Sequence, residues 1–122
     1  MTECTWKEEK RNRAVLVGLN AYSLSAEDNA TETTLEELAA LLETAGGECM
    51  GVILQNKDKP DARTFIGEGK VDEVRELAQA VEADLVVFDN EISPAQVRVL
   101  TEDIGIQVMD RAGLILDIFA QR

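Results

Sequence analysis

The feature that most constrains this chain is a regular alternation of short apolar runs with amphipathic helical patterns. Four apolar runs have the length and composition of buried strands: residues 13–19, 49–54, 85–88 and 106–109. Four helical patterns alternate with them: residues 34–45, 71–81, 94–104 and a last one from 110 or 111 onward. Strands that alternate with helices form parallel sheets with right-handed crossovers. We therefore expect an α/β fold, with a mostly parallel four-stranded sheet and helices on both faces.

Capping residues indicate where two of the predicted helices begin. Thr34 can cap the first helix, and Glu37 three residues later completes a capping box. Ser93 can cap the third helix in the same way, with Gln96 as its partner. The acidic stretch over residues 20–33 has no periodicity, so we predict a mobile loop between the first strand and the first helix.

Length and composition indicate one domain with a single aliphatic core. The chain has 122 residues and 45% hydrophobic content, but no apolar run approaches the roughly 18 residues of a membrane span. It has no histidine, and its two cysteines, Cys4 and Cys49, form no close pair, which argues against structural zinc and fits a reducing cytosol. We expect a cytoplasmic protein with a polar tail over residues 1–12 and one domain over residues 13–122.

The net charge of −12 limits the partners of this chain. Phosphate backbones and anionic membranes are held by lysine and arginine, so we expect neither autonomous nucleic-acid binding nor membrane binding. The charge is unevenly distributed, because residues 14–56 carry seven acidic and no basic side chains, whereas residues 57–75 carry five of each. Residues 57–75 therefore form a sizeable region of the chain that would not repel an anion.

That second region contains a glycine corner, Thr-Phe-Ile-Gly-Glu-Gly-Lys over residues 64–70, directly before a predicted helix. A helix N-terminus offers unpaired N–H groups and a partial positive charge, so Gly67, Gly69 and Lys70 could hold a phosphate. Neither standard motif fits: a Walker A loop ending at Lys70 would need glycine at position 64, and a dinucleotide fingerprint would need it at position 72. The alternative is a tight turn with Lys70 in solvent.

Acidic residues follow two of the predicted strands. Asp89 and Asp110 come directly after apolar runs, and the carboxyl ends of parallel strands share one edge of a sheet. With Glu91, they could bind Mg²⁺ through carboxylate oxygens or act as an acid–base pair. Acids in such positions also cap helices and hold turns, which is the interpretation that we favour. Nucleophilic catalysis has little support, because Cys49 lies in a strand without an activating base.

The last helical pattern is apolar on more than one side. Leu114, Ile115, Ile118 and Phe119 lie in a strongly apolar stretch close to the last residue. A helix with apolar positions spread this widely needs cover on more than one face. We expect this helix either to pack completely into the domain or to lack a partner that a longer protein supplies. In the second case the chain would self-associate through these four residues.

Five stretches, in this order, carry a family resemblance: residues 35–47, 55–61, 65–73 (FIGEGKVDE), 87–96 (VFDNEISPAQ) and 110–122 (DRAGLILDIFAQR). Together they resemble the N-terminal domain of the HflX family of ribosome-associated GTPases. The resemblance covers residues 13–122, nearly the whole chain, and only the preceding tail and the loop over residues 20–33 look unlike the core of the family.

The resemblance implies an α/β domain that, in the family, precedes a helical hairpin and a P-loop GTPase domain. Members of the family bind the large ribosomal subunit and hydrolyse GTP with Mg²⁺, and their N-terminal region is also implicated in binding adenine nucleotide. This chain has no GxxxxGK[ST] sequence, so GTP hydrolysis would belong to segments outside it. On this interpretation the chain is a fragment that ends where the linker helices begin, and it is not catalytic alone.

Two functions follow from the resemblance. In the first, which we favour, the chain is a docking and regulatory domain that helps an HflX-like GTP-binding protein associate with the large ribosomal subunit. In the second, it is an independent ATP-binding module. Gly67, Gly69 and Lys70 would then hold the phosphates, and Asp89 and Asp110 would hold Mg²⁺.

Overall fold

The computed structural model describes residues 12–120, apart from the side chain of Phe119. Within this range strands and helices alternate: β1 (Asn12–Ala21), α2 (Glu32–Thr44), β2 (Gly47–Lys57), α3 (Glu68–Ala80), β3 (Leu85–Phe88), α4 (Pro94–Ile104), β4 (Gln107–Asp110) and α5 (Arg111–Ala120). The predicted alternation is confirmed. The tail predicted over residues 1–12 lies outside the described residues except for Asn12, which begins β1.

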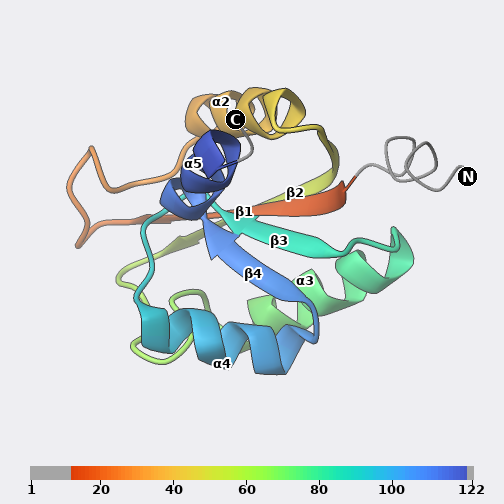
Figure 1. Ribbon diagram of the computed structural model, residues 1–122. Coiled ribbons are helices and arrows are strands. Elements are labelled where there is room, and N and C mark those ends of the chain that lie inside the picture. The colour runs from red at the N-terminus through yellow and green to blue at the C-terminus, as the bar shows by residue number, and fades with distance from the viewer. Residues whose placement is uncertain (1–11, 121–122) are drawn as a thin grey trace, which may run out of the picture.

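The sheet is parallel throughout, with the strand order β2-β1-β3-β4. Helices α2 and α5 cover one face and α3 and α4 cover the other, so that the domain has three layers (Figure 1). The predicted α/β fold, with a four-stranded parallel sheet and helices on both faces, is confirmed. From β1 the chain first moves outward to β2 and then returns to β3 on the other side of β1, so the order of strands reverses between β1 and β3.

The layers explain why β1 reads as an unbroken apolar run. Side chains alternate between the two faces of a strand, and both faces of this sheet are covered. Val15 and Val17 therefore belong to the core under α3 and α4. Ala14 and Leu16 belong to the core under α2 and α5. All four side chains are fully buried, as they must be in a central strand.

The capping prediction is confirmed for α4 and wrong for α2. Ser93 and Gln96 form the expected reciprocal pair at the start of α4. Helix α2 instead begins three residues earlier than predicted, with Thr31 as its N-cap and Thr34 as the partner. A threonine hydroxyl can accept the N–H of the third helical residue when it stands at the cap, and the N–H of the cap residue when it stands at the third position. Thr31 can therefore do what was expected of Thr34, although the sequence pattern, with Glu37 as the partner, favoured Thr34.

No helix within residues 12–120 has the length and apolar character that crossing a membrane requires. The longest helices, α2 and α3, have 13 residues each, and both carry exposed acidic side chains. A membrane-spanning helix needs about 20 predominantly apolar residues.

Candidate functional site

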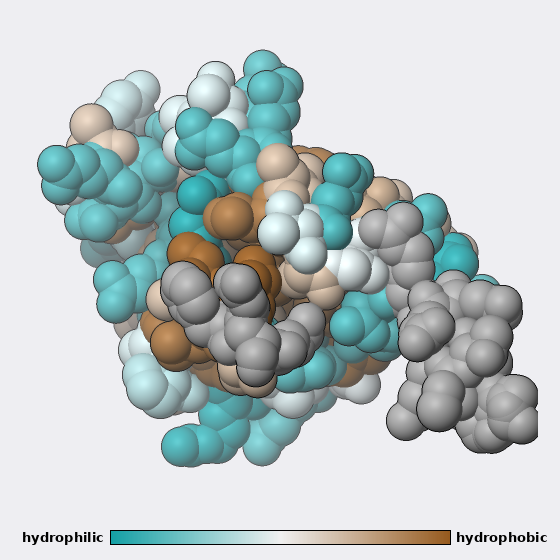
Figure 2. Space-filling model, turned by 45° about the horizontal axis from the view of Figure 1, so that its top comes forward, coloured by the Kyte–Doolittle hydropathy of each residue, from teal (hydrophilic) through white to brown (hydrophobic). Residues whose placement is uncertain are grey.

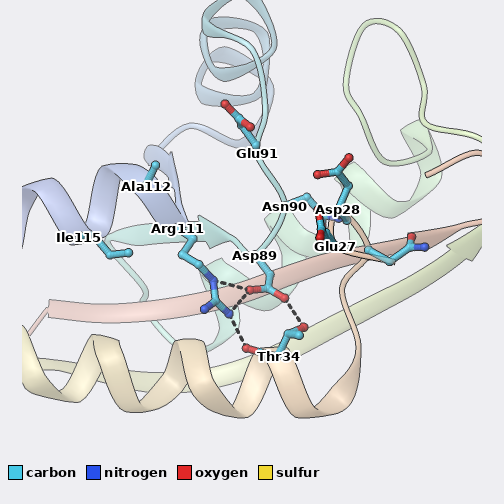
Figure 3. Close-up of a pocket in the computed structure, with 10 residues that line it drawn as sticks. Glu27, Asp28, Thr34, Asp89, Asn90, Glu91, Arg111, Ala112 and Ile115 are labelled. Atoms are coloured by element: carbon cyan, nitrogen blue, oxygen red, sulfur yellow. Dashed lines mark hydrogen bonds and ion pairs between the residues drawn. The ribbon is translucent and has the colours of Figure 1, made fainter. Parts of the chain in front are cut away.

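A pocket of about 430 Å³ lies at the carboxyl edge of the sheet, where the order of strands reverses. Parallel α/β sheets bind ligands at this place, because loops from neighbouring strands diverge there. The pocket is lined by residues 27–29 of the loop after β1, by Thr34, by residues 89–91 after β3, and by residues 111, 112 and 115 of α5 (Figure 3). We call it the switch-point pocket.

Arg111, Asp89 and Thr34 form a hydrogen-bonded network on one wall of this pocket (Figure 3). The Nε and Nη2 groups of Arg111 both donate to Asp89 Oδ1, at 3.0 and 2.5 Å. The Thr34 hydroxyl donates to the other carboxylate oxygen, Asp89 Oδ2, at 2.5 Å. Arg111 Nη2 also donates to the backbone carbonyl of Thr34, at 2.6 Å. We call these three residues the Arg111 joint, because they connect α2, the end of β3 and α5.

The fold places the three residues of the joint together. Strands β3 and β4 are paired so that Phe88 lies opposite Asp110, and Asp89 and Arg111 follow them at the same level. The Asp89 side chain is only 3% exposed and that of Arg111 is 28% exposed. Charge-assisted hydrogen bonds in such a shielded place are stronger than those between neutral groups. The joint therefore fixes the first turn of α5 against α2.

The predicted metal ligands Asp89 and Asp110 do lie at the same edge of the sheet, but protein donors hold both carboxylates. Asp110 Oδ1 accepts from the backbone N–H of Gly113 at 2.9 Å, and Asp110 Oδ2 accepts from that of Ile92 at 3.3 Å. Asp89 is paired with Arg111, whose charge opposes a second cation. Within residues 12–120, no three histidine, cysteine or acidic side chains are grouped as metal ligands. The geometry gives the Mg²⁺ hypothesis no support.

Asparagine side chains hold the loop between β1 and α2 beside the pocket. Asn90 is 4% exposed, and its Oδ1 accepts from the backbone N–H of Leu19 at 2.8 Å. Its Nδ2 donates to the carbonyls of Leu19 and Asp28, at 2.9 and 2.8 Å. Asn29 and Asn20 make further hydrogen bonds with the backbone at the two ends of the loop. The loop predicted to be mobile is thus tied to the sheet at several points.

Close packing on Gly18 fixes the end of the same loop. A Cβ atom at Gly18 would lie 2.6 Å from the Cβ of Ala30, which is closer than side-chain carbons approach one another. Ala30 is itself buried, and its N–H donates to the carbonyl of Leu19. A glycine is therefore required on β1 for the loop to return against the sheet before α2 begins.

The glycine corner lies at the start of α3, away from the switch-point pocket. Gly67 is the N-cap of α3, and its N–H donates to the Gln55 side chain at 2.9 Å. A Cβ atom at Gly67 would lie 3.2 Å from the Gln55 amide nitrogen, so the glycine allows close packing on β2. Lys70 pairs with Glu73 at 3.0 Å, and nothing lies within 4 Å of a Cβ at Gly69. Beyond the helix N-terminus itself, this geometry gives the ATP-binding hypothesis no support.

Asp61 organises the turn that leads into the glycine corner. Its carboxylate accepts from the backbone N–H groups of Thr64, at 3.1 Å, and Arg63, at 2.8 Å. These two hydrogen bonds, that from Thr64 first, hold the pKa of Asp61 below its ordinary value. They also support Phe65, which adopts a left-handed backbone conformation with φ of 67°.

We expect Asp61→Ala to lower the free energy of unfolding by about 1 kcal/mol at neutral pH, as for the loss of a capping side chain. A carboxyl whose pKa is lower in the folded state stabilises the fold at a pH above its unfolded pKa, about 3.9, and this contribution is lost as the pH falls through the folded pKa. Urea unfolding at pH 7 and below pH 4 measures the difference. Asp61→Asn keeps an acceptor but cannot titrate, so its stability should lack this pH-dependent part. An Ala variant with the same loss at both pH values would contradict the prediction.

The residues predicted to form an interface on α5 have different surroundings. Leu114 is buried in the core under α2, Ile118 packs against that core, and Ile115 lines the switch-point pocket. The side chain of Phe119 lies outside the described part of the structure. Leu116, which was not predicted, is 67% exposed. Figure 2 shows hydrophobic side chains grouped on the side of the molecule formed by α2 and α5. Self-association through α5 stays a prediction.

Burial of Cys49 determines its reactivity. The side chain packs at the margin of the core under α2, and this burial is the main cause that raises the pKa of its thiol. A hydrogen bond with the backbone of Gly51 lowers the pKa, and the negative charge of Glu43 raises it. Because the thiolate is the nucleophile, a raised pKa makes Cys49 a weak one at neutral pH.

The fold and the site together define a class of protein, a three-layer α/β domain whose carboxyl-edge pocket contains a charged structural joint. Residues 32–120 match the family described as "GTP-binding GTPase N-terminal". The chain belongs to this family and corresponds to the N-terminal part of the HflX GTPases, as the sequence resemblance predicted.

Several relatives share clear sequence similarity with the chain. It is 40% identical over 116 residues to GTPase HflX of Alkalihalophilus pseudofirmus, a match that covers 95% of this chain and 27% of that protein. It is 46% identical over 88 residues to GTPase HflX of Escherichia coli, which covers 72% of this chain and 21% of that protein. The chain thus spans about a quarter of the length of the relatives that it matches.

Solved structures show the same fold. A GTP-binding protein from the archaeon Sulfolobus solfataricus, in complex with GDP, matches with a TM-score of 0.64 at 20% identity, covering 89% of this chain and 30% of that one. The SsGBP and GDP complex matches with a TM-score of 0.65 at 19% identity, over 92% of this chain and 29% of that one. At these identities the likeness concerns the fold.

Proposed function

We propose that this chain acts as the N-terminal docking and regulatory domain of an HflX-type GTP-binding protein in the cytoplasm, and that it helps that protein associate with the large ribosomal subunit. The relatives are named GTPases, and they extend well beyond the part that corresponds to this chain. The segments beyond that part would bind and hydrolyse GTP with Mg²⁺. This domain contributes shape and contacts rather than chemistry.

The Arg111 joint is the observation that carries this proposal. Asp89 and Thr34 hold the first residue of α5 in one place, and Leu114 anchors the next turn in the core. A segment that follows α5 would therefore leave the domain in a fixed direction. A rigid exit of this kind lets a docking domain orient the rest of the protein on a large partner.

The charge of the domain restricts the kind of contact that it can make. With a net charge of −12, and with no basic residue between positions 14 and 56, it would repel the phosphate backbone of ribosomal RNA over most of α2. We therefore assign contacts with RNA to other segments of the longer protein. The domain would act through protein surfaces and through the orientation that it imposes.

Co-sedimentation with large ribosomal subunits tests the proposal. A full-length GTP-binding protein that carries this domain is compared with the same protein lacking residues 1–122 and with an Arg111→Met variant. We expect deletion to reduce the fraction bound at least several-fold. The Arg111→Met variant should bind more weakly than the parent, because α5 is no longer held in one orientation.

A matched arginine provides the control. Arg98 is exposed on α4, on the opposite face of the sheet from the joint, so Arg98→Met removes the same charge without touching α5. Its binding should equal that of the parent protein. Unchanged binding after deletion of residues 1–122 would refute the docking role. Equal losses in the two arginine variants would assign the effect to charge and not to orientation.

A further inference from the structure

Over residues 51–55, the outer side of β2 is a strand edge that no other strand of the described residues covers. β2 is the terminal strand of the sheet, and among residues 12–120 its strand pairing comes from β1 alone (Figure 1). Natural sheets protect such edges with charges, prolines or bulges. In β2 the register shift falls at Met50, and the charged residues Glu48 and Lys57 lie near the two ends. The middle of the strand, residues 51–55 (GVILQ), has none of these protections.

An apolar groove runs beside this edge, between β2 and α2. It has a volume of about 380 Å³, within the range of roughly 300–1,000 Å³ that is typical of binding clefts. Its apolar side chains are Leu35 and Ala39 of α2 with Val52 and Leu54 of β2. Val52 is 50% exposed, which is unusual for valine in the middle of a strand. We call this surface the β2 groove.

Acidic side chains border the β2 groove and determine what it can accept. Glu32 and Glu36, both exposed on α2, line it. The residues that line the groove all lie between positions 14 and 56, where there are seven acidic residues and no basic one. A nucleic acid would be repelled here. A second copy of the chain, joined groove to groove, would place these glutamates against their own counterparts, which is also unfavourable.

Backbone and side-chain chemistry together select an extended segment. A free edge presents unpaired N–H and C=O groups that an added strand can satisfy, and pockets for alternate side chains then give specificity. The side chains of an added strand that point toward α2 would meet the apolar floor of the groove and the carboxylates of Glu32 and Glu36. Apolar and basic side chains match these two surfaces.

We propose that the β2 groove binds an extended segment of a partner protein that carries aliphatic and basic residues at every second position, on the face turned toward α2, and that adds to β2 as a fifth strand. Its backbone pairs with residues 51–55, an aliphatic side chain enters between Ala39 and Val52, and a lysine or arginine approaches Glu36. This inference goes beyond the proposed function and does not depend on it, because the groove belongs to the chain itself.

Three short fluorescent peptides test the proposal with the full chain. The first, called the valine–lysine peptide, repeats Val-Thr-Lys-Thr, so that valine and lysine occur in turn on one face of the strand. The second, called the valine–glutamate peptide, has glutamate in place of lysine, and the third is the valine–lysine peptide with every backbone nitrogen methylated. Methylation keeps the side chains but removes the strand-pairing donors. In fluorescence anisotropy we expect the first peptide to bind, the second not to bind, and the third to bind at least about tenfold more weakly than the first, a difference of ~1.4 kcal/mol.

Charge-matched variants distinguish binding in the β2 groove from unspecific attraction to an acidic protein. Glu36→Lys reverses a charge in the groove, and Glu43→Lys reverses one near the end of the same helix, outside it. We expect Glu36→Lys to lower the affinity for the valine–lysine peptide at least tenfold and to bind the valine–glutamate peptide. The affinity of Glu43→Lys for the valine–lysine peptide should stay within about twofold of that of the parent protein. Val52→Lys should abolish binding of the valine–lysine peptide.

Three results would overturn the proposal. Equal losses in Glu36→Lys and Glu43→Lys would show unspecific attraction to an acidic protein. Undiminished binding of the methylated peptide would exclude strand addition. A concentration-dependent dimer in sedimentation velocity that Val52→Lys disrupts would assign the groove to a second copy of the chain. Both Glu36 and Glu43 are exposed, so unfolding of the variants, checked by circular dichroism, is not expected.

Discussion

Replacing Arg111 by methionine is expected to lower the free energy of unfolding by about 3 kcal/mol, the lower end of the range for removing one partner of a buried ion pair. Asp89, whose side chain is 3% exposed, would keep only the Thr34 hydroxyl as a donor. The carbonyl of Thr34 would also lose its bond from the guanidinium. Urea unfolding followed by circular dichroism measures the change as a shift of the midpoint.

Two further variants show whether the loss comes from the uncompensated charge. Arg98→Met, on the exposed side of α4, should change the free energy of unfolding by less than about 0.5 kcal/mol. The double variant Asp89→Asn, Arg111→Met removes both charges and should recover much of the stability that Arg111→Met loses, because an unpaired buried charge is the main cost. A double variant no more stable than the single one would show that the joint acts through packing and not through charge.

The fold was largely predictable because local patterns specify it. The run through Val15, Leu16 and Val17 is apolar on both faces, and this pattern is typical of a strand whose sheet is covered on both sides. The pattern of α4 contains its own N-cap, Ser93. The order of the strands could not be predicted in this way. It depends on which side of β1 each crossover returns, and no local pattern in the sequence records that choice.

The candidate site was predictable only in part. Because acids after parallel strands share an edge, the sequence placed Asp89 and Asp110 near each other, but it did not pair Asp89 with Arg111. That contact spans 22 residues and exists because β3 and β4 are neighbours. The role of Thr34 was also missed, since its hydroxyl meets Asp89 only when α2 begins at Glu32. Contacts that depend on strand order cannot be inferred before that order is known.

The loop after β1 shows a second reason for failure. Its sequence lacks periodicity and is acidic, and both properties are typical of mobile segments. Its order comes from side-chain amides that bond to backbone groups, chiefly Asn90 and Asn29. Such bonds leave no periodic signal. One of the two asparagines lies far away in the sequence, after β3.

The expected effect of replacing Asn90 by leucine is also a loss of about 3 kcal/mol in the free energy of unfolding. Three hydrogen bonds disappear, each worth about 1 kcal/mol, and the groups left behind on Leu19 and Asp28 lose the partner that the Asn90 amide supplied. Asn56→Leu, at the exposed end of β2, is the matched control and should be nearly neutral. Unfolding in urea gives both values.

Hydrogen exchange can separate a local from a global effect of the same substitution. Asn90 joins the carboxyl end of β1 to the loop through Asp28, so its loss should release the loop before the core unfolds. The amide proton of Asp28, which bonds to the Ser25 carbonyl within the loop, and that of Ala30, which bonds to the Leu19 carbonyl of β1, should then exchange faster than those of β1 itself. Since residues 27–29 line the switch-point pocket, such a release would show that one buried asparagine determines the shape of the pocket. Uniformly faster exchange in the loop and the sheet would contradict this local role.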